Sequence, residues 1–176
     1  LAMEGTTDFS LVISPLYHPQ SLEVTELYQE KILVAMSINH PVARRFPNIT
    51  GEEYPPLDFR ELDRENFIVI KKGQMMNRLY HDLCDRTGAS PRVVLESESM
   101  IAALALASAG LGVTLTTETL ARRAATAEPI RCFSIAPDVP PRTVAAAYRS
   151  DRYLSKAARE LIQVMLDVAG AKFQRG

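Results

Sequence analysis

Short apolar runs recur along the chain and predict buried β-strands. Residues 8–14 (DFSLVIS) alternate apolar and polar positions until Val12 makes both faces apolar. Strands that are apolar on both faces are typical of sheets that helices cover on either side. We expect further strands at the runs 31–36 (KILVAM), 67–70 (FIVI), 92–96, 113–115, 129–135 and 143–148.

Helical patterns separate these runs. Met76, Leu79, Tyr80 and Leu83 follow the i, i+3, i+4, i+7 spacing of an amphipathic helix, and Gly88 is placed to end it. We expect shorter helices at 57–64 and 117–125. A final helix should follow Ser155 as its N-cap, with an apolar stripe of Ala158, Leu161, Ile162, Met165, Leu166 and Ala169.

The segment 100–109 (MIAALALASA) is apolar on nearly every side. Two interpretations stay open: the helix is enclosed within its own domain, or a second subunit covers one face.

The alternation of strands and helices predicts an α/β fold with largely parallel sheets. The polar stretch from Ala43 to Pro56 contains Gly51 and the pair Pro55-Pro56, which makes it the best candidate for a linker between two lobes.

Length and charge limit the possible functions. The 176 residues fit one globular domain or two small lobes, and 20 basic against 21 acidic residues give a formal net charge of -1. Such a chain lacks the basic bias of a nucleic-acid-binding surface, so this segment itself is not expected to bind DNA. No apolar run approaches the roughly 18 residues of a membrane span, and the first ten residues do not resemble a signal peptide. The missing initiator Met suggests a fragment of a longer protein.

Candidate catalytic and metal-binding patterns are weak. His18, His40 and His81 show no metal-ligand spacing, so we expect surface or structural roles for them. Cys84 and Cys132 are far apart, which predicts two thiols in a reducing cytoplasm. The pair Gly110 and Gly112 follows a helix, the wrong order for a dinucleotide fingerprint. We therefore expect no enzyme activity, metal or cofactor.

Four motifs in order resemble the effector-binding domain of LysR-type bacterial transcription regulators. A Gly-x-x-Asp lead into a buried strand is similar to Gly5–Asp8, and a His-Pro-Leu-Ala-like turn is similar to His40–Ala43. The segment 96–121, with its AGLGV turn, is the strongest single match, and 142–165 resembles the family's last strand and helix. The resemblance covers nearly the whole chain.

The chain departs from this family at its start. A full effector domain begins with a strand, a helix and a second strand before the Gly-x-x-Asp element, so the chain resembles an N-terminally truncated domain. The resemblance implies two Rossmann-like lobes, as in periplasmic binding proteins, with the first incomplete. Lobe I would comprise 1–48 and 147–176, and lobe II 49–146.

The resemblance also implies a small-molecule effector in the cleft between the lobes. Open α/β sheets bind ligands at the carboxyl ends of their strands. This rule selects twelve candidate ligand-binding residues: Ser14, Pro15, Leu16, Met36, Ser37, Gln74, Met75, Met76, Glu96, Ser97, Glu98 and Ser99. The alternative for Gln74–Met76 is that they only start a helix and pack. The helix start after Glu96–Ser99 offers backbone N–H donors that favour an anionic group, so an organic acid is one expected ligand class.

Three functions are compatible with this sequence. The first is the sensor of a cytoplasmic transcription regulator, a homo-oligomer that reaches promoter DNA through an N-terminal winged helix-turn-helix domain not present in this chain. The second is a solute-binding component of a transport system with the same cleft. The third is an α/β enzyme, which requires a nucleophile and a base in the cleft.

Overall fold

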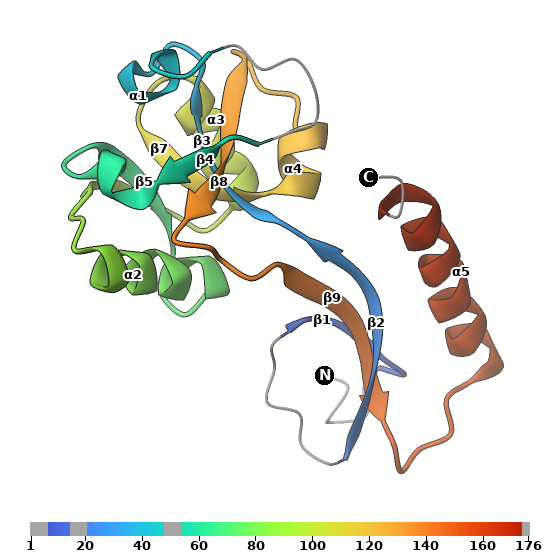
Figure 1. Ribbon diagram of the computed structural model, residues 1–176. Coiled ribbons are helices and arrows are strands. Elements are labelled where there is room, and N and C mark those ends of the chain that lie inside the picture. Colours follow the sequence, from blue (N-terminus) through green and yellow to red (C-terminus); the bar gives the residue numbers. More distant parts are fainter. Residues whose placement is uncertain (1–6, 15–20, 48–53, 174–176) are drawn as a thin grey trace. The chain divides into compact units, whose positions relative to one another are not determined.

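The computed structural model describes residues 7–14, 21–47 and 54–173 (Figure 1). The chain forms two compact units, Leu1–Glu30 with Pro141–Gly176 and Lys31–Pro140. The chain thus passes between the units at Glu30–Lys31 and Pro140–Pro141. The predicted division placed 31–48 in lobe I, 141–146 in lobe II and a linker at Ala43–Pro56. The difference arises because the strand at Ile32–Ser37 pairs on both sides with strands of the second unit.

The first unit contains a three-stranded sheet of order β1-β9-β2. Its strands are β1 (Ser10–Ser14), β2 (Leu22–Glu30) and β9 (Arg142–Arg149), and β9 is antiparallel to both neighbours. The sequence predicted β1 and β9 but missed β2. Three glutamates and a register shift between Glu26 and Tyr28 break the alternation that would have shown this strand.

Helix α5 (Lys156–Phe173) packs on β2 and follows the predicted cap. The backbone N–H of Ala158 donates to Ser155 Oγ at 3.2 Å. Ala158, Ile162 and Ala169 are buried as predicted, but Leu161 of the same predicted stripe is 50% exposed.

The second unit is built on a six-stranded sheet of order β4-β8-β3-β7-β5-β6. Strand β3 is antiparallel to β7 and β8, whereas β4 is parallel to β8 and β5 is parallel to β6 and β7. Five strands therefore run one way and β3 runs the other. The bounds are β3 (Ile32–Ser37), β4 (Pro56–Asp58), β5 (Asn66–Ile70), β6 (Arg92–Ser97), β7 (Val113–Thr117) and β8 (Ile130–Ala136).

Helices cover this sheet much as the patterns predicted. The elements are α1 (Pro41–Arg44), the 3-10 helix η1 (Phe59–Leu62), α2 (Met75–Thr87), α3 (Met100–Ser108) and α4 (Glu118–Arg123). Helix α2 ends at Gly88, whose φ of 73° is left-handed. The helix predicted at 57–64 is instead the short strand β4 followed by η1.

Helix α3 packs one face inside the second unit. Ala103, Leu104 and Ala107 are buried, and the helix contacts β3, β5 and β7. Its other face is open, with Ile101 64% exposed. At the turn that follows, Gly112 allows β7 to pass close to β5, since an added Cβ would lie 2.5 Å from Asn66 O.

The core of the second unit lies between the sheet and these helices. Its largest fully buried side chains include Phe59, Phe67, Phe133, Met36 and Leu83. The rings of Phe67 and Tyr80 are in contact, with centroids 4.7 Å apart and planes tilted by 41°, which ties β5 to α2. In the described part of the chain, no helix is long and apolar enough to cross a membrane.

Candidate functional site

Two parallel strands of the second unit end beside each other. Ile70, the last residue of β5, is the register partner of Ser97, the last residue of β6. The chain then turns into α2 after β5 and into α3 after β6. The predicted residues Gln74–Met76 and Glu96–Ser99 therefore meet at one edge of the sheet, as the strand-end rule implies.

Several hydrogen bonds join the two turns at this edge. The N–H of Lys71 donates to Ser97 O at 2.9 Å, and Gln74 Nε2 donates to Glu98 O at 3.3 Å. Lys71 Nζ lies 2.5 Å from Glu98 Oε1. The two loops thus form one connected polar surface, in which the lysine ammonium is partnered by a carboxylate.

The two serines organise the start of α3. Ser97 Oγ donates to Ser99 O at 2.9 Å and accepts from the Ser99 N–H at 3.2 Å. Ser99 caps the helix, because its Oγ accepts from the Ala102 N–H at 3.4 Å. The N-cap of α2, Gln74, makes no such side-chain bond. The first turn of α2 therefore presents backbone N–H groups without a side-chain cap, which is favourable for an anion.

The two methionines of α2 turn mainly toward the core. Met76 is only 4% exposed, and Met75 is partly buried against the same cluster. The neighbouring Asn77 is buried and donates from Nδ2 to Ile70 O at 2.8 Å, which fixes the start of α2 on the end of β5. Met76 is thus a core residue of the second unit, whereas Gln74 is exposed to solvent.

Met36 and Ser37 do not join this group. They end β3, which runs antiparallel to β7, so they lie at the opposite edge of the sheet from Ser97. Met36 is also fully buried. Met36 and Ser37 were predicted as ligand residues on the assumption that β3 runs parallel to its neighbouring strands.

The remaining three candidates belong to the first unit. Ser14 ends β1, while Pro15 and Leu16 lie outside the described residues.

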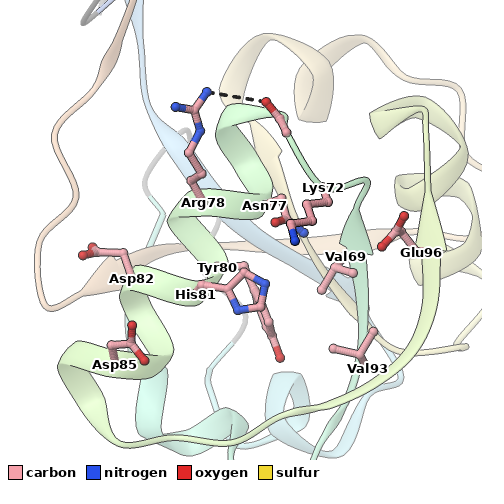
Figure 2. A pocket seen from close by; sticks show the side chains of 11 residues that line it. Val69, Lys72, Asn77, Arg78, Tyr80, His81, Asp82, Asp85, Val93 and Glu96 are labelled. Atoms are coloured by element: carbon pink, nitrogen blue, oxygen red, sulfur yellow. Dashed lines mark hydrogen bonds between the residues drawn. The ribbon is translucent and has the colours of Figure 1, made fainter.

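A groove of about 970 Å³ runs between α2 and the strands β5 and β6. Figure 2 shows Val69 and Val93 on the strand side, with Asn77 and Tyr80 of α2 beside them. The other lining residues are Lys72, Gly73, Arg78, His81, Asp82, Asp85 and Glu96. Of the predicted ligand residues that the structure describes, only Glu96 lines this groove.

Lys71 and Lys72 were not among the residues predicted to bind a ligand. They follow FIVI directly, so the strand-end rule would have selected them. Lys71 pairs with Glu98, and Lys72 lines the groove.

His40 and Cys132 hold structural positions, whereas His81 lines the groove and His18 lies outside the described residues. His40 Nδ1 accepts from the Val42 N–H at 3.3 Å as the N-cap of α1, and its Nε2 lies 3.5 Å from Glu65 Oε2. Burial lowers the pKa of His40 and raises that of Cys132 to about 12, so this thiol stays protonated at neutral pH. Among the described residues, no group of three or more His, Cys, Asp or Glu side chains is arranged to hold a metal.

The whole pattern matches one known family. The sequence model of the LysR substrate binding domain matches residues 1–170. The transcriptional dual regulator GltC of Bacillus subtilis (strain 168) is 30% identical over 92 residues, which are 52% of this chain and 28% of that protein. The HTH-type transcriptional regulator YwbI of the same strain is 27% identical over 160 residues, 91% of this chain and 51% of that protein. The chain thus spans about half of these regulators or less.

Solved structures of similar fold agree. The regulatory domain of Synechocystis PCC6803 CcmR, in complex with 2-PG, has a TM-score of 0.76 at 20% identity, with 97% of this chain and 77% of that chain covered. The effector binding domain of QuiR, in complex with shikimate, has a TM-score of 0.72 at 17% identity, with 98% and 76% covered. At these identities the likeness establishes the fold alone.

Proposed function

We propose that this chain, which belongs to the LysR substrate binding domain family, senses an organic acid for a transcription regulator. The observation that carries the proposal is the family match over residues 1–170, together with the polar side chains that gather where β5 and β6 end. The curated relatives that it matches include several transcription regulators, which favours this function over a component of a transport system.

The proposed ligand position is the carboxyl end of β5 and β6. An acid would accept hydrogen bonds from the first turn of α2 and from Gln74, whose side chain is exposed. The Ser99 hydroxyl caps the adjacent α3 and would offer its proton to the same ligand. The shikimate in the QuiR domain supports the choice of an acid.

The His40–Glu65 pair lies at the other end of the sheet from this site. His40 and Glu65, the described pair most similar to a catalytic dyad, lie beside the N-terminus of α1, where His40 accepts a backbone hydrogen bond. We therefore propose that the chain is not an enzyme. Ligand binding would change the populations of two states, and the output would reach promoter DNA through a separate domain of a cytoplasmic homo-oligomer.

Ligand titration of the chain 1–176 tests this proposal. Carboxylates, including shikimate, should raise the melting temperature, and Gln74→Ala should weaken the effect. Arg60→Gln, which removes an exposed charge that is paired with Asp58 and lies in neither turn, is the control. Stabilisation by amines or neutral sugars alone would exclude an organic acid as the ligand.

A further inference from the structure

A buried ion pair joins β2 to β9. Arg142 Nε donates to Glu30 Oε1 at 2.6 Å, and Arg142 Nη2 lies 2.5 Å from the same oxygen. The Glu30 side chain is 1% exposed and that of Arg142 is 14% exposed. By contrast, the Lys71–Glu98 pair is 53% and 77% exposed. Water therefore screens the Glu30–Arg142 pair far less than a surface pair.

This pair lies on the last rung of the ladder between the two strands. The register runs from Leu22 with Arg149 to Glu30 with Arg142 and goes no further. The next residues on the β9 side are Pro141 and Pro140, which have no N–H to donate. Backbone pairing cannot extend in the usual pattern, so the two side chains form the final link between β2 and β9.

The same rung marks where the chain leaves the first unit. The division into compact units falls between Glu30 and Lys31 and between Pro140 and Pro141. On the other side of the first boundary, the N–H of Glu118 donates to Lys31 O at 3.0 Å, and Ile32 is the register partner of Thr117. Each side of the Glu30–Lys31 peptide is thus anchored within its own unit.

We propose that Glu30 and Arg142 form a clamp that holds β2 and β9 together where both leave the first unit. The chain passes between the units twice, and the clamp would hold both passages together at their start in the first unit. Any bending of the chain between the units would then be confined to Glu30–Lys31 and Pro140–Pro141. Glu30 and Arg142 are positioning residues in this proposal, which does not depend on the identity of the effector.

A purely stabilising role explains the pair less well. Burying two charges costs solvation, and apolar pairs of similar size are often as stable or more stable. A charged pair with short hydrogen bonds fixes direction as well as distance, which an apolar contact does not. The clamp therefore predicts a local effect on the strand ends, whereas a general stabiliser predicts a uniform effect on the unit.

Amide hydrogen exchange of Glu30→Gln separates these two roles. Gln29 and Thr143, register partners one rung from the clamp, should exchange at least about tenfold faster, a factor worth about 1.4 kcal/mol. Val24 and Ala147, at the far part of the same ladder, should keep their rates. Equal acceleration at all four amides would overturn the clamp in favour of general stabilisation.

A second variant covers the case in which a lone buried charge prevents folding. The double change Glu30→Leu with Arg142→Met removes both charges and should fold. Spin labels at Ala105→Cys in α3 and Gln163→Cys in α5, with Cys84 and Cys132 replaced by alanine, would report on the two units. The double variant should broaden the distance distribution, and Arg60→Gln should not. An unchanged distribution together with unchanged exchange at Gln29 would refute the proposal.

Discussion

Lys71 Nζ lies 2.5 Å from Glu98 Oε1, and this contact connects the turn after β5 to the turn after β6. Both side chains are more than half exposed. An exposed ion pair of this kind contributes only about 0–1 kcal/mol to stability. Its main consequence is electrostatic, because Glu98 partners the cation that an acidic ligand would otherwise meet at this edge.

Removal of the Glu98 charge should therefore favour an acidic ligand. We expect Glu98→Gln to tighten binding of a carboxylate by about fivefold and Lys71→Ala to weaken it by a similar factor. Neither change should alter the free energy of unfolding by more than about 1 kcal/mol. Calorimetric titration and urea denaturation would measure both quantities, with Glu128→Gln as an exposed acidic control. A loss of affinity in Glu98→Gln would show that the carboxylate itself contacts the ligand.

Two glycines should differ in their response to alanine. Gly88 has a φ of 73° but open space around its missing Cβ, so Gly88→Ala should cost about 1–2 kcal/mol from backbone strain alone. In Gly112→Ala the new Cβ would lie 2.5 Å from Asn66 O, so β7 must move relative to β5. We expect a larger loss at Gly112, measured by urea denaturation of both variants. Similar losses would mean that β7 shifts easily.

Stability should fall at mildly acidic pH because of His40. Burial lowers the pKa of His40 below its ordinary value of 6.5, despite the raising effect of Glu65. Just below pH 6.5 the His40 side chain is therefore protonated in the unfolded chain but still neutral in the folded chain. The free energy of unfolding declines as the pH falls through 6.5 toward the lower pKa of the folded state. The slope from this group cannot exceed about 1.4 kcal/mol per pH unit.

The variant His40→Asn tests that slope, since asparagine keeps an N-cap acceptor without titrating near neutrality. Melting temperatures between about pH 7.5 and about pH 5.5 should fall less steeply in the variant than in the parent chain. Parallel curves would assign the acid sensitivity to other groups.

The open face of α3 offers a test of association. Ile101 is 64% exposed, and Leu111 beyond the helix is 43% exposed. If copies of the chain associate through this face, Ile101→Glu should lower the mass found by light scattering, because it would bury an unpaired charge. Glu160→Gln on α5 is a control. A parent chain that is already a monomer would remove this face as an interface.

The sequence predicted most elements of the second unit because their burial is periodic. FIVI became β5 and the Met76–Leu83 pattern became α2. Strand β2 was missed, since its glutamates and its register shift hide the alternation. The direction in which each strand runs could not be predicted from the sequence pattern either. Nothing in KILVAM distinguishes a parallel from an antiparallel strand, so Met36 and Ser37 were assigned to the wrong edge of the sheet.

The candidate site was predictable where it depended on local order along the chain. Gln74 and Ser99 lie in the turns that follow their strands, and parallel pairing of β5 with β6 brings them to one edge. The contact between Lys71 and Glu98 spans 27 residues, and the clamp between Glu30 and Arg142 spans 112. Such pairs depend on the completed register, which local patterns do not contain.

Thermal melting of the chain with a panel of carboxylates tests the central proposal most directly. A ligand at 100 times its Kd stabilises by about 2.7 kcal/mol, which for a chain of this size raises the melting temperature by about 5–10 °C. We expect at least one acid to reach this shift in the parent chain and in Arg60→Gln, with a clearly smaller shift in Gln74→Ala. A shift that Gln74→Ala leaves unchanged, or one produced only by amines or neutral sugars, would contradict an acid-binding sensor at the ends of β5 and β6.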